Sequence, residues 1–340
     1  MLRKNLYDLC SFLCSPYTHL NIIPKISLFT HENIFNQLQS KIDFKFQWNK
    51  RNNFIINDFK FSFKYEILEQ TSILIKVKLS IINSFILNPS INKNRSSMID
   101  DYIIIAEYTP NNNIKLYNLI SKEENPLLYH SLINKKLDFI NTFLPLKIDN
   151  IWNIDFKTLN SMYDKIQTLS YHFSTRKVKR NSKFNIETAC NYAETFALTP
   201  NPEYISYENF GGDCTNFISQ ILYSGGLKKT YSWTPYSNTW LRVEELYYYL
   251  INNALAYKLT DDDSLSKGTL IQFKTPRLGR FFHSGFITHR LPDGECLYCC
   301  HSYNKLNYPL SQIYPVLYPE LRSLYFYWFI DIIFIHIIIH

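Results

Sequence analysis

One cysteine of this chain lies where a thiol can act as a nucleophile. Cys214 follows Gly211, Gly212 and Asp213, and apolar residues then recur at helical spacing as far as Leu222. Cys214 is therefore predicted in the first turn of a helix, where unpaired N–H groups favour an anion and lower a cysteine pKa toward neutrality. Its own N–H can face the oxyanion that forms when a thiolate attacks an amide carbonyl. The alternative is a buried structural cysteine.

A thiol nucleophile needs a base, and usually a third group that orients the base. His283 begins a predicted strand, HSGFITHR, which follows the predicted strand GTLIQF and the loop KTPRLGRFF. His301 ends the next predicted strand, CLYCCH, and the turn PDG joins the two strands into a hairpin. His283 and His301 can be hydrogen-bonded there if the register places them on one face. Asn304 is a second candidate for the orienting group, and a structural role is the alternative for each histidine.

The remaining cysteines and histidines of this hairpin do not have the spacing of a metal site. Cys299 and Cys300 are adjacent in a strand, so their side chains point to opposite faces. No second CxxC or HxxxH pair completes a set of four ligands. His289 lies near the turn and is expected to be exposed. The sequence therefore predicts neither a metal nor another cofactor.

The elements that position these residues belong to the second half of the chain. All eight glycines lie between Gly211 and Gly294, so tight backbone geometry is expected there. The first half shows aromatic residues in alternation at 44–48 and 59–65, which predicts half-buried strands. Further strands are expected at 71–80 and 101–108, a turn at 109–113, and helices at 126–144, 154–173 and 186–198.

The composition permits two domains in a chain of 340 residues. With 46% hydrophobic and 16% aromatic residues the chain can bury a core, which excludes a disordered protein. We interpret residues 1–173 as an α+β accessory domain without a legible role, and the basic stretch 174–185 as a linker. The net charge of +7 suits an anionic partner or simply solubility. The basic stretch lacks interleaved aromatic residues, so no nucleic acid is expected.

Cysteine usage and the two ends of the chain bear on location. Seven cysteines, an odd and scattered set, do not indicate a disulfide framework. The N-terminus lacks the apolar stretch of a signal peptide, so a cytoplasmic location is expected, with spore or cell-wall association as the alternative. The apolar stretch 324–340 is interrupted by Asp331 and His336 and is predicted to be a buried strand. A short membrane anchor is the alternative.

The run NYAETFALTPNPEYISYENFGGDCTNFISQILYSGG resembles the putative amidase domain family, which is related to the papain-like NlpC/P60 and CHAP hydrolases. Trp240, GTLIQF, the pairs beginning at His283 and His301, and NYPLS at 307–311 extend the resemblance over about residues 185–330. The resemblance implies a C-terminal papain-like domain at 186–340 in an α+β chain, with the helix that carries the cysteine packed against an antiparallel sheet.

The resemblance also implies roles for individual residues. Cys214 would be the nucleophile, His283 the base, and His301 the third polar group, with Asn304 as second choice. The loop KTPRLGRFF replaces the acidic stretch that the family resemblance leads us to expect before the histidine, which changes the charge expected of the cleft.

The same resemblance implies binding roles for two residues that precede Cys214 in the sequence. Asp213 would help to hold substrate, and the competing interpretation is a cap at the helix N-terminus. Tyr207 would line the oxyanion site.

The expected function is hydrolysis of an amide or peptide bond through an acyl-enzyme intermediate. Peptidoglycan-type peptides are the expected substrate class by family analogy alone. The alternatives are a non-catalytic binding protein on the same fold and a membrane-associated protein that uses the apolar C-terminal stretch. The presence of Cys214, His283 and His301 together favours the enzyme.

Overall fold

The computed structural model describes residues 2–18, 32–108, 114–133, 152, 154–171, 184–210, 212–259, 265–274 and 278–326. The chain divides into two compact units, Met1–Tyr163 and Asp164–His340. Each unit combines helices with antiparallel strands, consistent with the predicted α+β class. The helix α5 (Phe156–Tyr171) contains the division, and most of the predicted linker 174–185 lies outside the described residues.

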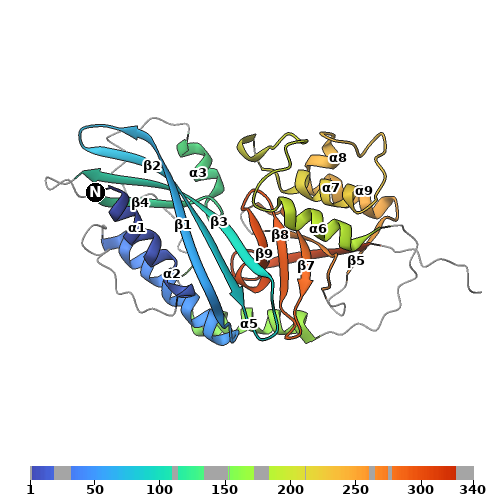
Figure 1. Cartoon of the computed structure of the whole chain (residues 1–340), viewed down its shortest axis with the longest axis horizontal. Helices are drawn as coiled ribbons and strands as arrows, with labels where there is room; N and C mark the ends of the chain where they lie inside the picture. Colours follow the sequence, from blue (N-terminus) through green and yellow to red (C-terminus); the bar gives the residue numbers. More distant parts are fainter. Residues whose placement is uncertain are drawn as a thin grey trace, which may run out of the picture. The chain divides into compact units, whose positions relative to one another are not determined.

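The first unit is an antiparallel sheet with two helices along one face (Figure 1). Its strands pair in chain order: β1 (Ile56–Gln70), β2 (Leu74–Leu87), β3 (Arg95–Tyr108) and β4 (Ile114–Ser121). The helical segments are α1 (Leu2–Leu13), the 3-10 turn η1 (Ser15–Tyr17), α2 (Glu32–Arg51) and α3 (Pro126–Ile133). Leu9 and Ile42 pack with Val77 and Ile104. Tyr129 of α3 packs on the opposite face, which successive residues of a strand supply.

The alternating aromatic residues at 44–48 do not form the predicted strand, because they belong to α2. Phe44 and Trp48 are four residues apart, so they share one face of the helix, and their rings stack at 6.0 Å. Three aromatic residues at positions i, i+2 and i+4 fit both a strand and a helix. The prediction was wrong because a run of five residues is too short to distinguish the two. The prediction for 59–65 is confirmed by β1.

The remaining predictions in the first half are confirmed over the described residues. Strands β2 and β3 contain most of 71–80 and all of 101–108. The helix predicted at 126–144 is observed as α3, and its later part lies outside the described residues. The helix predicted at 154–173 is α5, and the turn predicted at 109–113 also lies outside them.

The second unit contains an antiparallel sheet in the order β9-β8-β7-β6-β10-β5. Its strands are β5 (Ala256–Lys258), β6 (Leu270–Lys274), β7 (Phe281–Arg290), β8 (Cys296–Cys300), β9 (Lys305–Pro309) and β10 (Glu320–Phe326). Its helices are α6 (Ile186–Phe196), α7 (Cys214–Ser224), α8 (Asn238–Leu241) and α9 (Val243–Asn252), with 3-10 turns η3 (Glu208–Phe210) and η4 (Leu310–Gln312).

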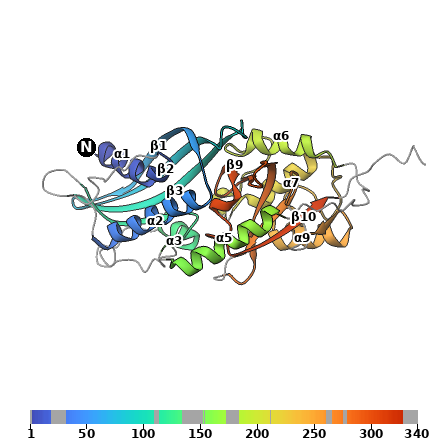
Figure 2. The ribbon, with the colours of Figure 1, turned by 90° about the horizontal axis from the view of Figure 1, so that it is seen from below.

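Helices α6 and α7 lie side by side against this sheet, as the view from below also shows (Figure 2). Phe217 and Ile221 of α7 pack on Leu270 of β6 and Phe286 of β7, and all four are fully buried. The apolar spacing that predicted a helix after Cys214 is therefore the face that α7 buries.

The predicted hairpin is present, and the strand predicted at 324–340 is described only in its first three residues. β7 and β8 pair antiparallel with Phe286 opposite Cys299. Leu324 and Phe326 are buried in β10, and residues 327–340 lie outside the described residues. Among the helices of the described residues, none is long and apolar enough to cross a membrane.

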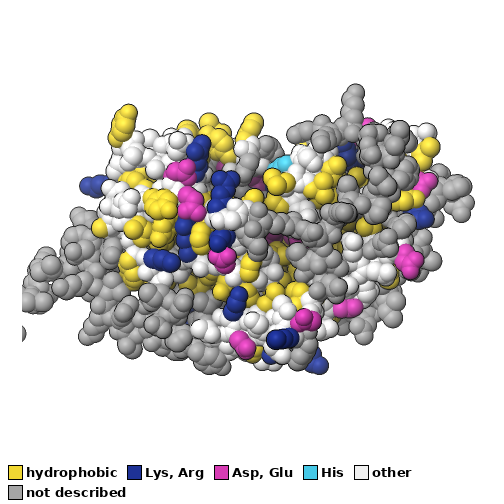
Figure 3. Space-filling model, turned by 180° about the vertical axis from the view of Figure 1, so that it is seen from behind, with side chains coloured by type: hydrophobic (Ala, Val, Ile, Leu, Met, Phe, Trp, Pro, Cys, Tyr) yellow, Lys and Arg dark blue, Asp and Glu magenta, His cyan; other side chains and the backbone are white. Residues whose placement is uncertain are grey.

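Figure 3 shows how charge is distributed on one face of the molecule. The Lys and Arg side chains on this face lie among acidic and hydrophobic ones. Among the coloured side chains of this face, which belong to the described residues, the basic ones do not gather into a single patch.

Gly268 stands where the turn before β6 meets α6. Its φ is +89°, and its N–H donates to the Ile287 carbonyl oxygen at 2.8 Å. A Cβ at this position would lie 2.4 Å from Cδ1 of Ile186. Gly279 also has a positive φ, +62°, but a Cβ there would meet nothing within 4 Å.

We expect Gly268→Ala to destabilise the fold more than Gly279→Ala. Both substitutions cost about 1–2 kcal/mol because an L-residue must adopt a left-handed backbone. Gly268→Ala adds about 1–3 kcal/mol because it overpacks the contact with Ile186. Urea unfolding of the two variants and the wild type measures the difference. Equal losses of the free energy of unfolding would contradict the packing argument.

Candidate active site

Cys214 is the first residue of α7 and is 7% exposed. The first hydrogen bond of the helix runs from the Phe217 N–H to the Asp213 carbonyl oxygen, 2.9 Å. The N–H of Cys214 precedes this bond, so the helix does not use it. A Cβ on Gly212 would lie 3.1 Å from the Ser302 hydroxyl oxygen, which explains the glycine before the helix, and Gly211 lies outside the described residues.

The thiol of Cys214 lies against the backbone of β7 on both sides of His283. Its sulfur is 3.9 Å from the carbonyl oxygen of Phe282, and the backbone of Ser284 also hydrogen-bonds it. The hydroxyl of Thr215 is 3.8 Å from the same sulfur. The fold therefore brings the predicted nucleophile to the strand segment that carries the predicted base.

The pKa of this thiol is raised, whereas the sequence predicted that it would be lowered. Burial raises the pKa of Cys214 above 9.0, and the charge of Asp213 raises it further. The hydrogen bonds from Thr215 and from the Ser284 backbone lower this pKa by less than burial raises it. Desolvation of a thiolate in an enclosed position thus outweighs the positive end of the helix. The thiol therefore keeps its proton at neutral pH.

His283 is 1% exposed on β7, opposite Phe273 of β6. Aromatic rings surround its imidazole, with centroids 5.6 Å away for Phe273, 5.0 Å for Tyr303 and 6.0 Å for Tyr318. Burial lowers the pKa of His283 to about 3, and the positive charge of Lys305 contributes. The Nε2 atom is buried and has no hydrogen-bond partner among the described residues. His283 is therefore a neutral imidazole that can accept a proton.

His301 follows β8 directly and is hydrogen-bonded to other groups than His283. Its Nδ1 lies 2.7 Å from Oδ2 of Asp213, and its Nε2 lies 2.7 Å from the carbonyl oxygen of Phe196. The pairing of β7 with β8 ends at Phe286 and Cys299, so His301 lies beyond the paired part of the hairpin. The structure brings His301 to Asp213 and leaves it no free ring nitrogen for His283.

Asn304 lies in the turn between β8 and β9, next to the tyrosine whose ring contacts His283. It is 8% exposed, and its Oδ1 is buried without a hydrogen-bond partner among the described residues. A buried polar atom without a partner costs about 1–3 kcal/mol, and such atoms in native proteins call for a functional explanation. Asn304 and His283 both carry such an atom.

Asp213 is 1% exposed, and four groups surround it. Its Oδ1 accepts from the Tyr207 N–H and from Nδ2 of Asn216, both at 2.8 Å, and its Oδ2 faces His301. Its own N–H donates to the Ser302 hydroxyl at 2.7 Å. Asp213 stands at the N-cap position, but its side chain makes no capping hydrogen bond, so the predicted cap is wrong. Its carboxylate binds the preceding loop instead, and its role in holding substrate stays a prediction.

Tyr207 is half-buried and tied to the site by its backbone. Its N–H donates to Asp213, and its carbonyl oxygen accepts from Phe210 and Gly212. Its ring lies 6.1 Å from that of Tyr236, in a tilted arrangement. A role of Tyr207 in the oxyanion site stays a prediction.

Sequence reasoning missed Asn216, which is 1% exposed. Its Nδ2 also donates to the Ile205 carbonyl oxygen at 2.9 Å, and its Oδ1 accepts from the Trp240 indole at 2.8 Å. The available signal was a polar residue two positions after Cys214 on an apolar helix face. Its partners could not be read from the sequence, because Ile205 lies in the loop before η3 and Trp240 lies in α8, 24 residues after Asn216 along the chain.

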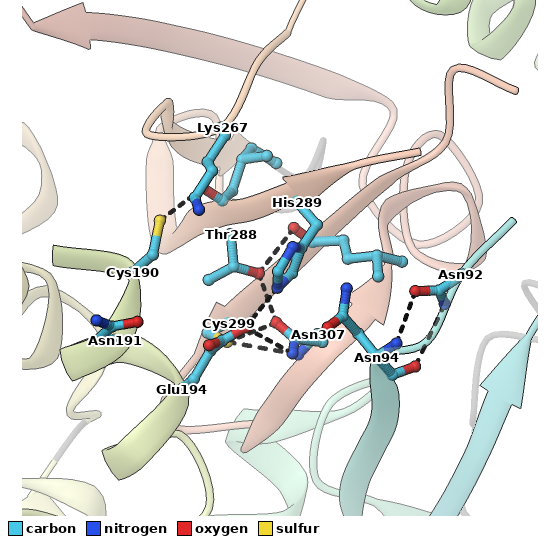
Figure 4. A network of polar contacts seen from close by, with 12 residues as sticks. Asn92, Asn94, Cys190, Asn191, Glu194, Lys267, Thr288, His289, Cys299 and Asn307 are labelled. Carbon is cyan, nitrogen blue, oxygen red and sulfur yellow. Dashed lines mark hydrogen bonds and ion pairs between the residues drawn. The ribbon is translucent and has the colours of Figure 1, made fainter. Parts of the chain in front are cut away.

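A second histidine–carboxylate pair lies at the other end of β7 (Figure 4). Nε2 of His289 is 2.5 Å from Oε1 of Glu194, which also accepts from Nδ2 of Asn307 at 2.8 Å. The hydrogen bond from His289 lowers the pKa of Glu194. His289 is thus paired and half-buried rather than exposed as predicted, because α6 lies over this part of the strand. In the described part of the chain, no three His, Cys, Asp or Glu residues are arranged to hold a metal ion.

Comparison with known proteins finds a family model that resembles most of the second unit. Residues 183–325 match the model of the family described as "Putative amidase domain". This range contains Cys214, His283, His301 and Asn304. The coarse function that the match supports is amide hydrolysis.

Two curated relatives come from Bacillus subtilis (strain 168), and both are described as uncharacterized. YjcM is 28% identical over 134 residues, which are 37% of this chain and 32% of that protein. YhbB is 30% identical over 112 residues, which are 29% of this chain and 35% of that protein. The chain thus spans about a third of the length of these relatives. No solved structure matches the chain.

The raised pKa of Cys214 predicts slow alkylation at neutral pH. We expect the rate of Cys214 modification by iodoacetamide, followed by peptide mass, to rise about tenfold per pH unit up to and beyond pH 9, as the thiolate fraction rises. His283→Gln should leave this profile nearly unchanged, because a neutral imidazole lends the thiolate no charge. Fast alkylation below pH 7 that His283→Gln abolishes would instead demonstrate a resting thiolate–imidazolium pair.

The lowered pKa of His283 predicts a loss of stability in acid. The folded protein binds this proton at about pH 3 and the unfolded chain at about 6.5, so between these values the unfolded chain holds more protons. Stability therefore falls as the pH is lowered through this window, by about 5 kcal/mol in total. His283→Gln should remove this contribution, measured as the free energy of urea unfolding against pH.

Comparing wild type with His283→Gln separates the contribution of His283 to the pH dependence of stability from that of Glu295. Burial raises the pKa of Glu295 to about 7, so its contribution to stability is present in acid and is lost as the pH rises through that value. This contribution has the opposite sign and is common to both proteins. Parallel pH profiles of wild type and His283→Gln would contradict the assignment.

Proposed function

We propose that residues 183–325 form a papain-like, cysteine-dependent amide hydrolase with Cys214 as nucleophile and His283 as base. The observation that carries the proposal is the contact of the Cys214 sulfur with the backbone on both sides of His283. The match to the amidase family supports the reaction class. Burial keeps the imidazole of His283 neutral, so one of its ring nitrogens has a lone pair that can accept a proton.

The resting charges set the order of the first step. Because the thiol and the imidazole are both neutral, proton transfer accompanies attack rather than preceding it. The sulfur bonds to the amide carbon, the carbonyl electron pair moves to oxygen, and the thiol proton passes to His283. The unused N–H of Cys214 at the start of α7 stabilises the oxyanion.

The later steps return the site to its resting state. The C–N bond breaks, His283 gives its proton to the leaving amine, and a thioester remains on Cys214. A water molecule then attacks the thioester carbon while His283 takes its proton. The C–S bond breaks, the carboxylic acid leaves, and the sulfur regains the proton from His283.

Asn304 is the residue that we assign to orient the base. Its buried Oδ1 lacks a hydrogen-bond partner among the described residues, as does Nε2 of His283, and Tyr303 beside it contacts the imidazole. A bond from Nε2–H to this oxygen would leave Nδ1 to receive the thiol proton. His301 is a weaker candidate because both of its ring nitrogens have other partners.

The substrate class is proposed as peptide amides of the peptidoglycan type. This choice rests on the family resemblance, and apolar side chains near the nucleophile are compatible with a peptide. Ile205 and Phe210 are 56% and 81% exposed on the loop that Asn216 and Asp213 attach to α7. Exposed apolar residues beside a site are common binding contacts.

A non-catalytic binding protein is the second candidate. The burial of Cys214 and its raised pKa favour it, since structural cysteines share both properties. A binding protein would retain substrate affinity when Cys214 is replaced and would show no turnover in the wild type.

We expect the purified chain to hydrolyse peptide amides, tested with peptidoglycan-derived and simple N-acyl peptides by mass spectrometry. Cys214→Ala should abolish turnover, and His283→Gln should lower kcat about 10²–10⁴-fold. Asn304→Ala should lower kcat by a smaller factor, because it acts through His283. Cys296→Ala, which removes a buried thiol at the turn end of the hairpin, is the matched control and should keep full activity.

Two results would overturn the proposal of a cysteine-dependent hydrolase. Turnover that survives in Cys214→Ala would remove the nucleophile. Binding without turnover, equal in wild type and Cys214→Ala, would establish the binding protein.

A further inference from the structure

His301 is enclosed by groups that accept hydrogen bonds. Its Nε2 lies 2.7 Å from the carbonyl oxygen of Phe196, and its Nδ1 lies 2.7 Å from Oδ2 of Asp213. The ring is 1% exposed. A backbone carbonyl oxygen has no hydrogen to donate, so Nε2 must carry one.

The carboxylate of Asp213 requires a hydrogen on the other ring nitrogen, Nδ1. Oδ1 of Asp213 already accepts from the Tyr207 N–H and from Nδ2 of Asn216. Hydrogen bonds of this kind favour the ionised carboxylate, which cannot donate to the ring. Nδ1 of His301 must therefore donate as well. An imidazole that donates from both nitrogens is an imidazolium.

A third contact fits the same charge state. The ring of His301 lies flat on that of Phe217, with centroids 3.8 Å apart and planes 4° apart. The face of an aromatic ring attracts a cation at this distance. Tyr192 of α6 and Cys214 of α7 are titratable groups that the charge of Asp213 reaches, and burial raises the pKa of each, so both are neutral.

We propose that His301 is held as an imidazolium and, paired with Asp213, positions the start of α7 instead of orienting His283. The pair joins three elements: Phe196 ends α6, Asp213 precedes α7, and His301 follows β8. The charge state stands by itself, whereas its effect on catalysis rests on the proposed function.

The pair acts on the reaction through the geometry of Cys214. The other oxygen of Asp213 holds the Tyr207 N–H and Asn216, so the ion pair fixes the loop and the first turn of α7 together. The sulfur and the oxyanion donor of Cys214 both depend on that turn. A misplacement of about 1 Å in such a group can cost about 100-fold in rate.

The same hairpin offers a matched control. His289 is also paired with a carboxylate, Glu194, and lies six residues from His283 along β7, which is roughly 20 Å. Figure 4 shows that this pair belongs to a separate network with Thr288 and Asn307. Loss of the control pair should affect stability without moving the site.

Nuclear magnetic resonance of the full chain tests the charge state without requiring activity. In ¹⁵N-labelled protein near neutral pH, with the signals of His301 assigned by their loss in His301→Gln, both ring nitrogens should show the shifts of protonated nitrogen. Both N–H protons should exchange slowly, because the ring is buried. One protonated and one bare nitrogen would overturn the proposal.

Kinetics of Asp213→Asn, His301→Gln and the double variant test the positioning role. Each single variant should lower kcat about 10- to 100-fold with little change in KM. The double variant should be no worse than either single one, because the two residues act as a unit. His289→Gln should keep kcat, even where its melting temperature falls as far as that of His301→Gln.

The outcomes separate the two hypotheses. A fall of kcat in His289→Gln equal to that in His301→Gln, or unchanged kcat in His301→Gln, would overturn the positioning role. If the wild type hydrolyses no amide, the proposed function fails, and the resonance measurement still decides the charge of His301.

Discussion

The candidate site depends on the enclosed carboxylate of Asp213. It accepts hydrogen bonds from the Tyr207 backbone and from Asn216, and it faces the His301 ring, all within 2.8 Å. A buried carboxylate is tolerated only where its oxygens find donors, so the loop, the helix and the end of β8 must all supply one. These contacts also fix the backbone at the start of α7. Cys214 is bonded directly to Asp213, so its position is fixed with it. Asp213 is thus the residue that links the loop, the helix and the end of β8 at the site.

Burial determines the charge of both candidate catalytic groups. It raises the pKa of the Cys214 thiol and lowers that of His283 to about 3, and both shifts favour the uncharged form. The positive end of α7 acts in the opposite direction on the thiol, but a helix terminus contributes about 2 kcal/mol at most, less than the cost of burying a charge. A site of this kind would generate its charges only when substrate is present. The proposed mechanism therefore joins proton transfer to nucleophilic attack.

The hairpin β7–β8 carries three histidines in three different environments. His283 lies among aromatic rings and is neutral, His301 lies between two acceptors, and His289 is half-buried beside Glu194. The three histidines thus differ in the groups that surround their ring nitrogens. All three lie within residues 183–325, which match the model of the family described as "Putative amidase domain".

The sequence by itself determined the features that depend on neighbours along the chain. The helix beginning at Cys214, the hairpin closed by PDG and the strands β1 to β3 follow from periodicity and turn chemistry within about ten residues. The short aromatic run at 44–48 lacked the length to distinguish a helix from a strand. Only the tertiary structure decided which group His301 binds, since Asp213 is 88 residues away. It also decided the pKa of Cys214 and of His283, because desolvation depends on which side chains enclose a group and not on its place in the sequence.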